Sequence, residues 1–363
     1  MAERTDIIVF GTGSFAGRIV FDIAATAKHP VSVTVAGRNQ ERLDWLKTAG
    51  NARATIFECP ATFTSRTVDL ANSDGAAALL SDLRPSLVVQ AASPQASAII
   101  AAKGNAWSQL IAEGGLSAMA VTQTMFSVRV ARAIKSANPD CHFINCAYPD
   151  VGNTIISALG LPVTCGVGNV SILASVFAGA LDERAPGHLK VLAHYQTITP
   201  FRSSPDNRNG RPPRVWLGEE EIADVYGTLR DVKLTAAPAI DVSGAAGVPL
   251  MLSLISGDDW LGHAPGVHGL SGGYPVACRN GELDLALPSS LSREDAVRWN
   301  EEFEQADGLF VDSDGRAHYA GKLHEKLSAI SPDLAQGFNV ADFDDVFDSM
   351  EVLRTRLLEE PER

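Results

Sequence analysis

Short apolar runs alternate with helical hydrophobic patterns along the first part of the chain. Buried strands are predicted where apolar residues run together: Asp6–Phe10, residues 31–39, Ala54–Phe57, Thr67–Leu70, Ser86–Gln90, His142–Cys146 and Val163–Val167. Helices are predicted at residues 18–27, 74–84 and 115–137, and from near Val151 to Gly160. Strands that alternate with helices indicate a doubly wound parallel sheet of the Rossmann type.

The second part of the chain has a different pattern. Strands are expected at 188–200, 232–243 and 283–287, helices at 248–256 and 292–306, and a helical tail over 318–360. We therefore predict an α/β protein of two domains. Residues 1–168 would form a dinucleotide-binding Rossmann domain, and residues 169–363 an α+β substrate and dimerisation domain that ends in the helical tail.

A glycine-rich turn follows the first predicted strand. It reads GTGSFAG and comprises Gly11, Thr12, Gly13, Ser14, Phe15, Ala16 and Gly17. Gly11 permits a tight turn, Gly13 lets a pyrophosphate approach the backbone, and Ala16 or Gly17 lets the next helix lie close to the sheet. The start of that helix offers free N–H groups to phosphates. The turn therefore predicts a dinucleotide site.

The end of the second predicted strand bears on which dinucleotide binds. It reads Gly37-Arg38-Asn39, whereas an NAD enzyme usually carries Asp or Glu here to bind the ribose hydroxyls. Arg38 can pair with a 2′-phosphate and stack beside adenine, so NADP(H) is expected ahead of NAD(H). The alternative is an ordinary surface arginine in a turn.

Small residues follow another predicted strand of the same sheet. Ala91, Ala92 and Ser93 come after Ser86–Gln90 and suit a backbone that lies against the cofactor. The stretches GTGSFAG and VAGRNQERL resemble the cofactor domain of saccharopine-dehydrogenase-like NADP oxidoreductases. The resemblance covers about a hundred residues and implies the cofactor more firmly than the substrate.

The layout from residue 115 to about residue 195 is similar to the lactate/malate dehydrogenase superfamily and to the related NAD-dependent family 4 glycosidases. These proteins have a long helix, a strand that ends in an Asn-containing turn before Pro and a helix, and then another strand. The resemblance implies that Asn145 lies by the nicotinamide ribose and that His194, in VLAHYQ, takes the place of the catalytic histidine.

The sequence also departs from these families. The hydroxyacid dehydrogenases carry an Asp and an Arg where this chain has Gly168 to Leu173, which argues against a simple lactate or malate dehydrogenase. The glycosidases use a Cys and a His as metal ligands, and Cys165 with His194 could imitate that pair. Two such ligands alone do not define a metal, so no metal site is predicted.

Hydride transfer to C=O or C=N needs a proton donor beside the acceptor atom. His194 suits this role because histidine titrates near neutral pH, although it could equally be a hydrogen-bonded histidine on a strand. Tyr148 and Asp150 follow a strand, at the edge where open α/β sheets bind ligands. Asp150 would orient His194 or bind a substrate amine, or it is simply a helix N-cap.

Two loops are further candidates. Residues 201–214 hold four arginines, Arg202, Arg208, Arg211 and Arg214, and could clamp a carboxylate or phosphate of the substrate. A solvated surface loop is the alternative. Residues 263–275 are rich in glycine, and His268 there is a second acid–base candidate, although turn chemistry alone also explains the glycines.

Composition narrows the class of protein. Apolar residues make up 45% of the chain and charged residues 20%, and no segment is apolar enough for a membrane span. The N-terminus reads as neither a signal nor a transit peptide, so a cytoplasmic protein is expected. A net charge of −13 argues against nucleic-acid binding. The five cysteines form no CxxC pair and are expected as buried free thiols.

The sequence thus predicts an NADP(H)-dependent dehydrogenase or reductase. It would reduce a ketone or imine of a small polar, anionic metabolite, or catalyse the reverse, as a homodimer. Two alternatives stay open: a cofactor-assisted lyase or hydrolase of the family 4 glycosidase type, and a non-catalytic NADP(H)-binding protein.

Overall fold

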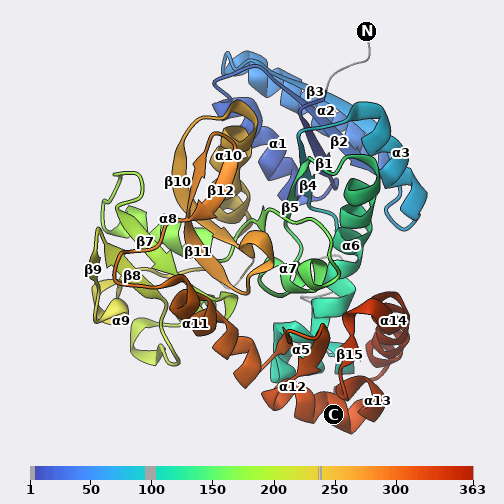
Figure 1. The fold of residues 1–363 in the computed structure, drawn as a ribbon, viewed down its shortest axis with the longest axis vertical. Coiled ribbons are helices and arrows are strands. Elements are labelled where there is room, and N and C mark those ends of the chain that lie inside the picture. The colour runs from blue at the N-terminus through green and yellow to red at the C-terminus, as the bar shows by residue number, and fades with distance from the viewer. Residues whose placement is uncertain (1–4, 95–103, 236, 238, 363) are drawn as a thin grey trace.

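The computed structural model describes residues 5–94, 104–235, 237 and 239–362. The amino-terminal sheet lies at one end of the long axis and the last helices lie at the other (Figure 1). Within the described part of the chain, no helix combines the length and the apolar character that crossing a membrane requires.

The amino-terminal part forms a six-stranded parallel sheet with the order β3-β2-β1-β4-β5-β6. The strands are β1 (Ile7–Phe10), β2 (Val31–Gly37), β3 (Ala61–Thr67), β4 (Leu87–Gln90), β5 (His142–Asn145) and β6 (Cys165–Gly166). Phe10 at the end of β1 pairs with Ala36 of β2 and Gln90 of β4. The carboxyl ends of the three central strands therefore meet at one edge, and the predicted Rossmann-type sheet is confirmed.

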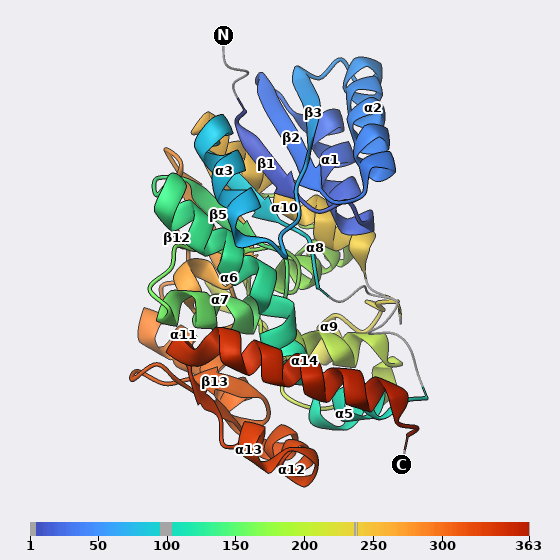
Figure 2. The same ribbon diagram turned by 90° about the vertical axis from the view of Figure 1, so that its right-hand side faces the viewer.

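Helices cover both faces of this sheet. Because successive side chains of a strand point to opposite faces, Ile7 and Val9 of β1 belong to one apolar core and Ile8 and Phe10 to the other. One face carries α1 (Ser14–Thr26), α2 (Gln40–Ile56) and α10 (Ile240–Ser256). The other carries α3 (Ser73–Leu83) and α6 (Ala120–Ala137), as Figure 2 shows.

The rest of the chain builds three small antiparallel sheets. Their strands are β7 (Leu189–Leu192), β8 (Arg214–Leu217) and β9 (Glu220–Glu221); β10 (Trp260–Pro265), β11 (Gly273–Arg279) and β12 (Glu282–Leu285); and β13 (Leu309–Val311), β14 (Arg316–Tyr319) and β15 (Phe338–Asn339). A bridge between Ala193 and Gly273 joins the first two sheets.

The remaining helices connect and cover these sheets. They are α5 (Ala106–Gly114), α7 (Pro149–Ala158), α8 (Val170–Ala180), α9 (Val225–Thr228), α11 (Arg293–Ala306), α12 (Gly321–Ile330), α13 (Pro332–Ala335) and α14 (Phe343–Glu359). Short 3₁₀ helices are η1 (Leu116–Met119), η2 (Tyr195–Arg202), η3 (Pro205–Asn207), η4 (Val267–Gly269) and η5 (Val340–Asp342).

The carboxy-terminal helices return to the amino-terminal half. Helix α14 packs against α5 and α6, and α12 packs against α5. Arg132 of α6 holds Asp344 of α14 through two hydrogen bonds of 2.9 and 2.6 Å. Helix α10 likewise packs on α1, although it lies beyond residue 168 in the sequence. The division into two domains at residue 168 stays a prediction.

Two predicted strands in the sheet region are wrong. Thr67–Leu70 is not a strand, because β3 ends at Thr67 and the buried Val68 and Leu70 belong to the following loop. Ala54–Phe57 is the end of α2 and the following turn, and β3 begins only at Ala61. Helix α2 buries Leu43, Leu46, Gly50 and Ala54, whose spacing places them on one helical face. Asn39 caps this helix by accepting a hydrogen bond from the Arg42 amide at 3.0 Å.

Three expectations for the second part are also corrected. The strand expected at 188–200 ends at Leu192, because a 3₁₀ helix that contains Pro200 follows it. No strand is found in the described part of 232–243, where α10 begins at Ile240. The helical tail expected over 318–360 also contains the end of β14 and the whole of β15.

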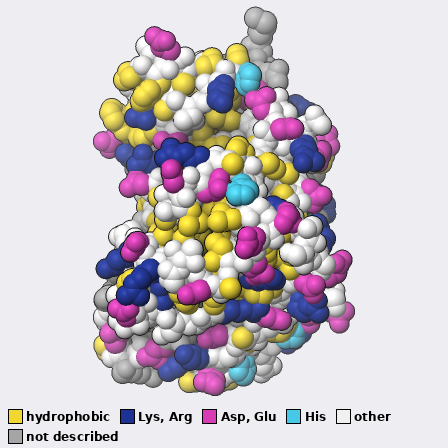
Figure 3. All heavy atoms as spheres, turned by 90° about the vertical axis from the view of Figure 1, so that its left-hand side faces the viewer, with side chains coloured by type: hydrophobic (Ala, Val, Ile, Leu, Met, Phe, Trp, Pro, Cys, Tyr) yellow, Lys and Arg dark blue, Asp and Glu magenta, His cyan; other side chains and the backbone are white. Residues whose placement is uncertain are grey.

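The surface over α8, β7 and β10 mixes acidic and basic side chains, with apolar side chains gathered between them (Figure 3).

Candidate functional site

A cavity of about 560 Å³ lies at the carboxyl ends of β1, β2 and β4. This volume falls within the range that small-molecule and cofactor sites occupy. The described lining residues are Gly11, Thr12, Gly13, Ser14, Phe15, Ala36, Gly37, Arg38, Asn39, Val68, Leu70, Ala91, Ala92, Ser93, Met119, Gln123, Phe126, Cys146, Ala147, Tyr148 and Ile240. Eleven of the thirteen residues predicted to bind the cofactor are therefore brought together.

The two residues of that prediction outside the lining are both buried. Ala16 packs beneath the turn in the core. Asn145 accepts a hydrogen bond from Ser127 and donates to Asn153 and to the Ala147 carbonyl, at 2.8, 2.8 and 3.0 Å. Asn145 thus holds the turn that carries Tyr148 and is not at the cavity wall.

The glycine turn has room for a phosphate group. Gly11 has a φ of +130°, and a Cβ on it would lie 3.0 Å from the backbone of Ala91 and Ala92. A Cβ on Gly13 would meet no described atom within 4 Å. Gly13 also caps α1, and no hydrogen bond from a side chain of the described residues occupies that cap. Free amides therefore face the space beside Gly13.

Arg38 is the charged residue of the described lining. Its side chain is 66% exposed, and its Nε lies 3.8 Å from a carboxylate oxygen of Asp69, which follows β3. At this exposure the ion pair is weak, so the guanidinium can turn to another anion at little cost. No carboxylate stands at the end of β2, where Gly37 packs against Thr12.

The far end of the cavity is uncharged in its described lining. Ala91, Ala92 and Ser93 come from the end of β4, and the Ser93 hydroxyl donates to the Gln123 carbonyl oxygen of α6 at 2.5 Å. Tyr148 completes this end. It follows β5 in the left-handed conformation, with a φ of +51°, and the next residue, Pro149, begins α7. This backbone geometry turns the tyrosine ring to the cavity wall.

Tyr148 is the outermost member of a polar network that runs into the protein. Its hydroxyl lies 2.8 Å from the Ser117 hydroxyl, and the Tyr195 hydroxyl lies 3.0 Å from the same atom. Ser117 donates to Glu304 Oε2 at 2.6 Å. Ser117 has one hydrogen, which this bond uses, so both tyrosines donate to its oxygen.

Glu304 brings α11 into this network. Its side chain is 2% exposed, and its Oε2 also accepts the Leu309 amide at 2.7 Å. His194 Nε2 lies 3.2 Å from Glu304 Oε1, within ion-pair distance, although no hydrogen bond aligned on Nε2 is found among the described residues. His194 Nδ1 accepts the Gln196 amide at 3.4 Å, so the ring hydrogen belongs on Nε2, facing Glu304.

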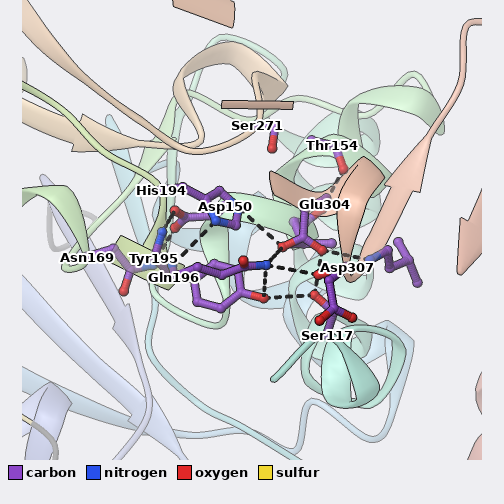
Figure 4. A network of polar contacts seen from close by, with 12 residues as sticks. Ser117, Asp150, Thr154, Asn169, His194, Tyr195, Gln196, Ser271, Glu304 and Asp307 are labelled. Carbon is purple, nitrogen blue, oxygen red and sulfur yellow. Dashed lines mark hydrogen bonds and ion pairs between the residues drawn. The ribbon is translucent and has the colours of Figure 1, made fainter. Parts of the chain in front are cut away.

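Asp150 lies on the other side of His194 (Figure 4). It accepts the Tyr195 amide at 3.1 Å and a hydrogen bond from the Asn169 side chain. Burial raises the pKa of Asp150, and the charge of His194 partly opposes this rise. Asp150 thus belongs to the same buried cluster as His194, and its role in orienting that ring stays a prediction.

Burial also shifts the pKa values of the two tyrosines in this network. It raises the pKa of Tyr148 well above its ordinary value, and Tyr195 and Glu304 add to the rise. Burial and then Glu304 do the same for Tyr195. Both phenols are therefore protonated at neutral pH and can act as hydrogen-bond donors.

His194 itself is fully buried and is not among the described residues that line the cavity. Its ring stacks on Phe303, with centroids 5.0 Å apart, and contacts Tyr195. Of the four predicted catalytic residues, Tyr148, Asp150 and His194 are brought together. His268 lies apart on η4, exposed, with its Nε2 bonded to the Leu283 carbonyl at 2.8 Å.

The predicted arginine clamp does not converge on the cavity, since none of its members is among the described lining residues. Arg208 lies over Phe201 and donates to the carbonyls of Leu229 and Arg230. Arg211 binds Glu302 at 2.7 Å. Arg214 makes a two-pronged contact with Glu221, and Arg202 is exposed at the end of η2.

All five cysteines are free thiols as expected, but only Cys141, Cys165 and Cys278 are buried, whereas Cys59 and Cys146 are half-buried. Burial raises the pKa of Cys165 on β6 far above its ordinary value, which disfavours the thiolate that a metal would need. Across the described residues, no three His, Cys, Asp or Glu side chains are grouped to hold a metal ion.

Several residues at this site were missed from the sequence. Met119, Gln123 and Phe126 line the cavity from the helical region, where their spacing indicates only a core face. Ser117 and Glu304 meet although they are 187 residues apart. A buried Glu in an otherwise polar helix is a weak signal, because Glu is ordinarily exposed and α11 carries exposed carboxylates such as Glu294 and Glu302.

No family model and no curated protein sequence matches the chain. Solved structures do share its fold. Malate dehydrogenase from Picrophilus torridus, solved in its apo form, matches with a TM-score of 0.55 and 10% identity, covering 96% of this chain and 99% of that chain. Malate dehydrogenase from Salinibacter ruber matches with a TM-score of 0.52 and 13% identity, over 96% and 99%.

Lactate dehydrogenase from Eimeria maxima, solved with NADH and oxamate, matches with a TM-score of 0.51 and 13% identity, over 84% of this chain and 92% of that chain. The chain therefore has the fold of lactate and malate dehydrogenases, as the resemblance of its sequence to that superfamily implies. The resemblances to saccharopine-dehydrogenase-like proteins and to family 4 glycosidases stay predictions.

Proposed function

We propose that this protein is an NADP(H)-dependent oxidoreductase that reduces a ketone or imine of a small polar metabolite, or catalyses the reverse. The observation that carries the proposal is a single cavity with the open glycine turn at one part of its wall and Tyr148 at another. A bound nicotinamide would supply the hydride for reduction, or accept it in the reverse reaction.

The wall of the cavity fits such a cofactor. The open space at Gly13 and the free amides of α1 suit a pyrophosphate. Arg38 stands where NAD enzymes place a carboxylate, and its guanidinium can pair in two-pronged fashion with a 2′-phosphate. These features favour NADP(H) over NAD(H).

Tyr148 is the residue that we assign to contact with the substrate. Tyr148 lines the cavity and carries a phenol, whereas His194 is fully buried and is not among the described lining residues. Because the pKa of Tyr148 is raised, its phenol carries a proton at neutral pH and can donate it to a carbonyl oxygen as hydride arrives. A protonated Tyr148 favours the direction of reduction.

We propose that Asp150 orients His194 and Tyr195.

The substrate is proposed as a small metabolite, with the hydroxy acids of the lactate and malate dehydrogenases as its nearest guide. An anionic charge on the substrate stays a prediction. The described lining near Tyr148 offers the polar side chains of Gln123 and Ser93 and no cation. The roles of Arg202, Arg208, Arg211 and His268 stay predictions too, as do the homodimer and the cytoplasmic location.

Consumption of NADPH in the presence of carbonyl compounds tests this function. A panel of 2-oxo acids, neutral ketones, aldehydes and cyclic imines is offered with NADPH and then with NADH. We expect at least one class to be reduced faster with NADPH. If NADPH binds but every compound is left unchanged in both directions, the protein is a dinucleotide-binding protein without this activity.

A further inference from the structure

We propose that Ser117 and Glu304 form a proton relay to Tyr148 at the cavity, with His194 held against the far oxygen of Glu304. The inference rests on the proposed oxidoreductase function and adds two positioning residues to it. The distances are 2.8 Å from Tyr148 to Ser117, 2.6 Å from Ser117 to Glu304, and 3.2 Å from Glu304 to His194.

The relay answers a difficulty at Tyr148. A phenol that lost its proton here would become an anion in a buried place beside Glu304, which both burial and like charge disfavour. Donation to a substrate is therefore unfavourable unless another proton replaces the lost one in the same event. Ser117 is the group that can do this, because its hydroxyl contacts the Tyr148 oxygen directly.

The hydrogen bonds have a direction that fits such a transfer. With Glu304 ionised, Ser117 donates to Glu304 and Tyr148 donates to Ser117. When Glu304 carries a proton, rotation of the hydroxyl hydrogens reverses the chain. Glu304 then donates to Ser117, Ser117 to Tyr148, and Tyr148 to the cavity, while the heavy atoms stay in place.

Atoms and charge balance in this step. Hydride from NADPH goes to the carbonyl carbon, and the carbonyl oxygen takes the Tyr148 proton. Tyr148 takes the Ser117 proton, Ser117 takes the proton of Glu304, and Glu304 returns to its carboxylate. After the alcohol leaves, Glu304 regains its proton on Oε2 from the cavity, through Tyr148 and then Ser117, while the Nε2–H of neutral His194 faces Glu304 Oε1. The alcohol and NADP⁺ are the products.

The surroundings of the relay suit proton storage. Its titratable members are Tyr148, Tyr195, Glu304, His194 and Asp150, all in contact with one another or with Ser117 or His194. No Lys or Arg contacts these groups in the described interactions, so two carboxylates flank one imidazole. A proton on Glu304 therefore lowers the net negative charge of a buried cluster.

A double-mutant cycle read by NMR tests the link without cofactor or substrate. The probe is the ¹³Cζ resonance of Tyr148 in protein labelled at the five tyrosines, identified by its loss in Tyr148→Phe. It is measured in the wild type, Glu304→Gln, Ser117→Ala and the double variant. We expect Glu304→Gln to displace this resonance, and the displacement to disappear in the Ser117→Ala background.

An equal displacement in both backgrounds would mean that Glu304 acts on Tyr148 through space, and the relay would be wrong. Ser117→Thr, which keeps the hydroxyl, serves as the conservative variant and should preserve the coupling. If Ser117→Ala melts too low to study, the cycle is run with Ser117→Cys, whose weak S–H donor should also break the coupling. Thermal unfolding of each variant shows whether the fold is kept.

Single-turnover oxidation of NADPH with the best compound of the carbonyl panel then tests the role. We expect Glu304→Gln and Ser117→Ala to slow hydride transfer by about 10- to 100-fold, with Ser117→Thr near the wild type. NADPH affinity should stay unchanged. Glu294→Gln is the matched control, because it makes the same change in the exposed first turn of the same helix.

The outcomes separate the relay from the proposed function. Coupling in the NMR cycle without reduction of any carbonyl by the wild type would leave the network in place and overturn the function. Reduction at an unchanged rate in Glu304→Gln would keep the function and overturn the relay. Slower reduction by Glu304→Gln, together with an NMR displacement that disappears in the Ser117→Ala background, supports both the relay and the proposed function.

Discussion

At the scale of single residues, two glycines of the same turn have different roles. Gly11 needs its positive φ, and a side chain there would press on the backbone after β4. Gly13 has an ordinary φ and faces open space. The first glycine is required by the fold, and the second by the ligand that we propose.

Gly13→Val and Gly11→Val separate these roles. We expect Gly13→Val to unfold at the temperature of the wild type and to weaken NADPH binding by about 100-fold or more, since its side chain fills the pyrophosphate space. Gly11→Val should lower the free energy of unfolding by about 1–3 kcal/mol. Thermal unfolding and fluorescence titration measure both. Normal NADPH binding by Gly13→Val would contradict the placement of the cofactor.

Arg38→Ala tests the choice of cofactor. Removal of one charged hydrogen-bonding partner should weaken NADPH binding by about 1.5–3 kcal/mol, roughly 10- to 100-fold, and leave NADH binding unchanged. Titration with both nucleotides provides the comparison. An equal loss for both would show that Arg38 has no contact with a 2′-phosphate.

Tyr148→Phe tests the residue at the cavity wall. The change removes one hydroxyl and keeps the ring that packs against Tyr195, with centroids 5.2 Å apart. We expect kcat for carbonyl reduction to fall by about 10²- to 10⁴-fold, while the dissociation constant for NADPH stays the same. A variant that reduces carbonyls at the wild-type rate would remove Tyr148 from the chemistry.

Elements differ in how far the sequence predicts them. The central strands β1, β2, β4 and β5 and the helices α1, α3, α6 and α7 are predicted because each is a buried apolar run or a periodic pattern bounded by local signals. Helix α2 is not predicted, although Asn39 caps it. Ala54–Phe57 was mistaken for a strand because four residues cannot distinguish a helix end from a short strand. In the small antiparallel sheets, β8–β9, β11–β12 and β13–β14 are hairpins, and the Asn280-Gly281 turn is a local signal that could have found one of them. The pairings of β7 with β8 and of β14 with β15 join more distant segments, which no local pattern records.

The residues of the site also differ in how far the sequence predicts them. Its cofactor part lies within a few consecutive turns after β1, β2 and β4, so motif spacing predicts it. The network behind Tyr148 joins η1, β5, η2 and α11, and only the fold brings them together. Tyr148, Asp150 and His194 were predicted as chemical groups, whereas Ser117 and Glu304 required the structure.

Helix α11 should transmit changes at its start to the network. Ser292 caps it by accepting the Asp295 amide at 3.0 Å, and Glu304 lies near its other end. We expect Ser292→Ala to lower the free energy of unfolding by about 1 kcal/mol, because it leaves end amides unsatisfied. Ser292→Asn is the matched control and should unfold like the wild type. Urea unfolding gives both values.

The whole molecule contains a pH-sensitive contact between two sheets. His263 of β10 accepts the Val191 amide of β7 at 2.9 Å through its Nε2. Burial lowers the pKa of His263 to about 3, so the folded protein holds this ring neutral while the unfolded chain would protonate it near its ordinary pKa. Stability from this group is full above about pH 6.5 and falls as the pH drops toward 3.

We therefore expect the wild type to lose about 1–2 kcal/mol of unfolding free energy between pH 7.5 and pH 5 through this group. His263→Gln should be less stable at neutral pH and should lose less on acidification. Urea unfolding at both pH values measures the difference. An identical pH dependence in the variant would rule out His263 as the source.

At this scale the chain shares its architecture with lactate and malate dehydrogenases, at 10–13% identity. The wall of its cavity carries Arg38 after β2, and Tyr148 leads to a buried Ser-Glu-His chain. The fold places a cavity at the edge of the sheet, and we propose that these residues decide which dinucleotide and which proton path it uses.

Equilibrium titration of the protein with NADPH and with NADH, followed by energy transfer from tryptophan to the reduced nicotinamide, tests the central claim most directly. The account predicts one saturable site per chain that binds NADPH at least about 10-fold more tightly than NADH, a difference of roughly 1.4 kcal/mol. Equal affinities would contradict the role of Arg38. Binding of neither nucleotide would contradict the cofactor site itself.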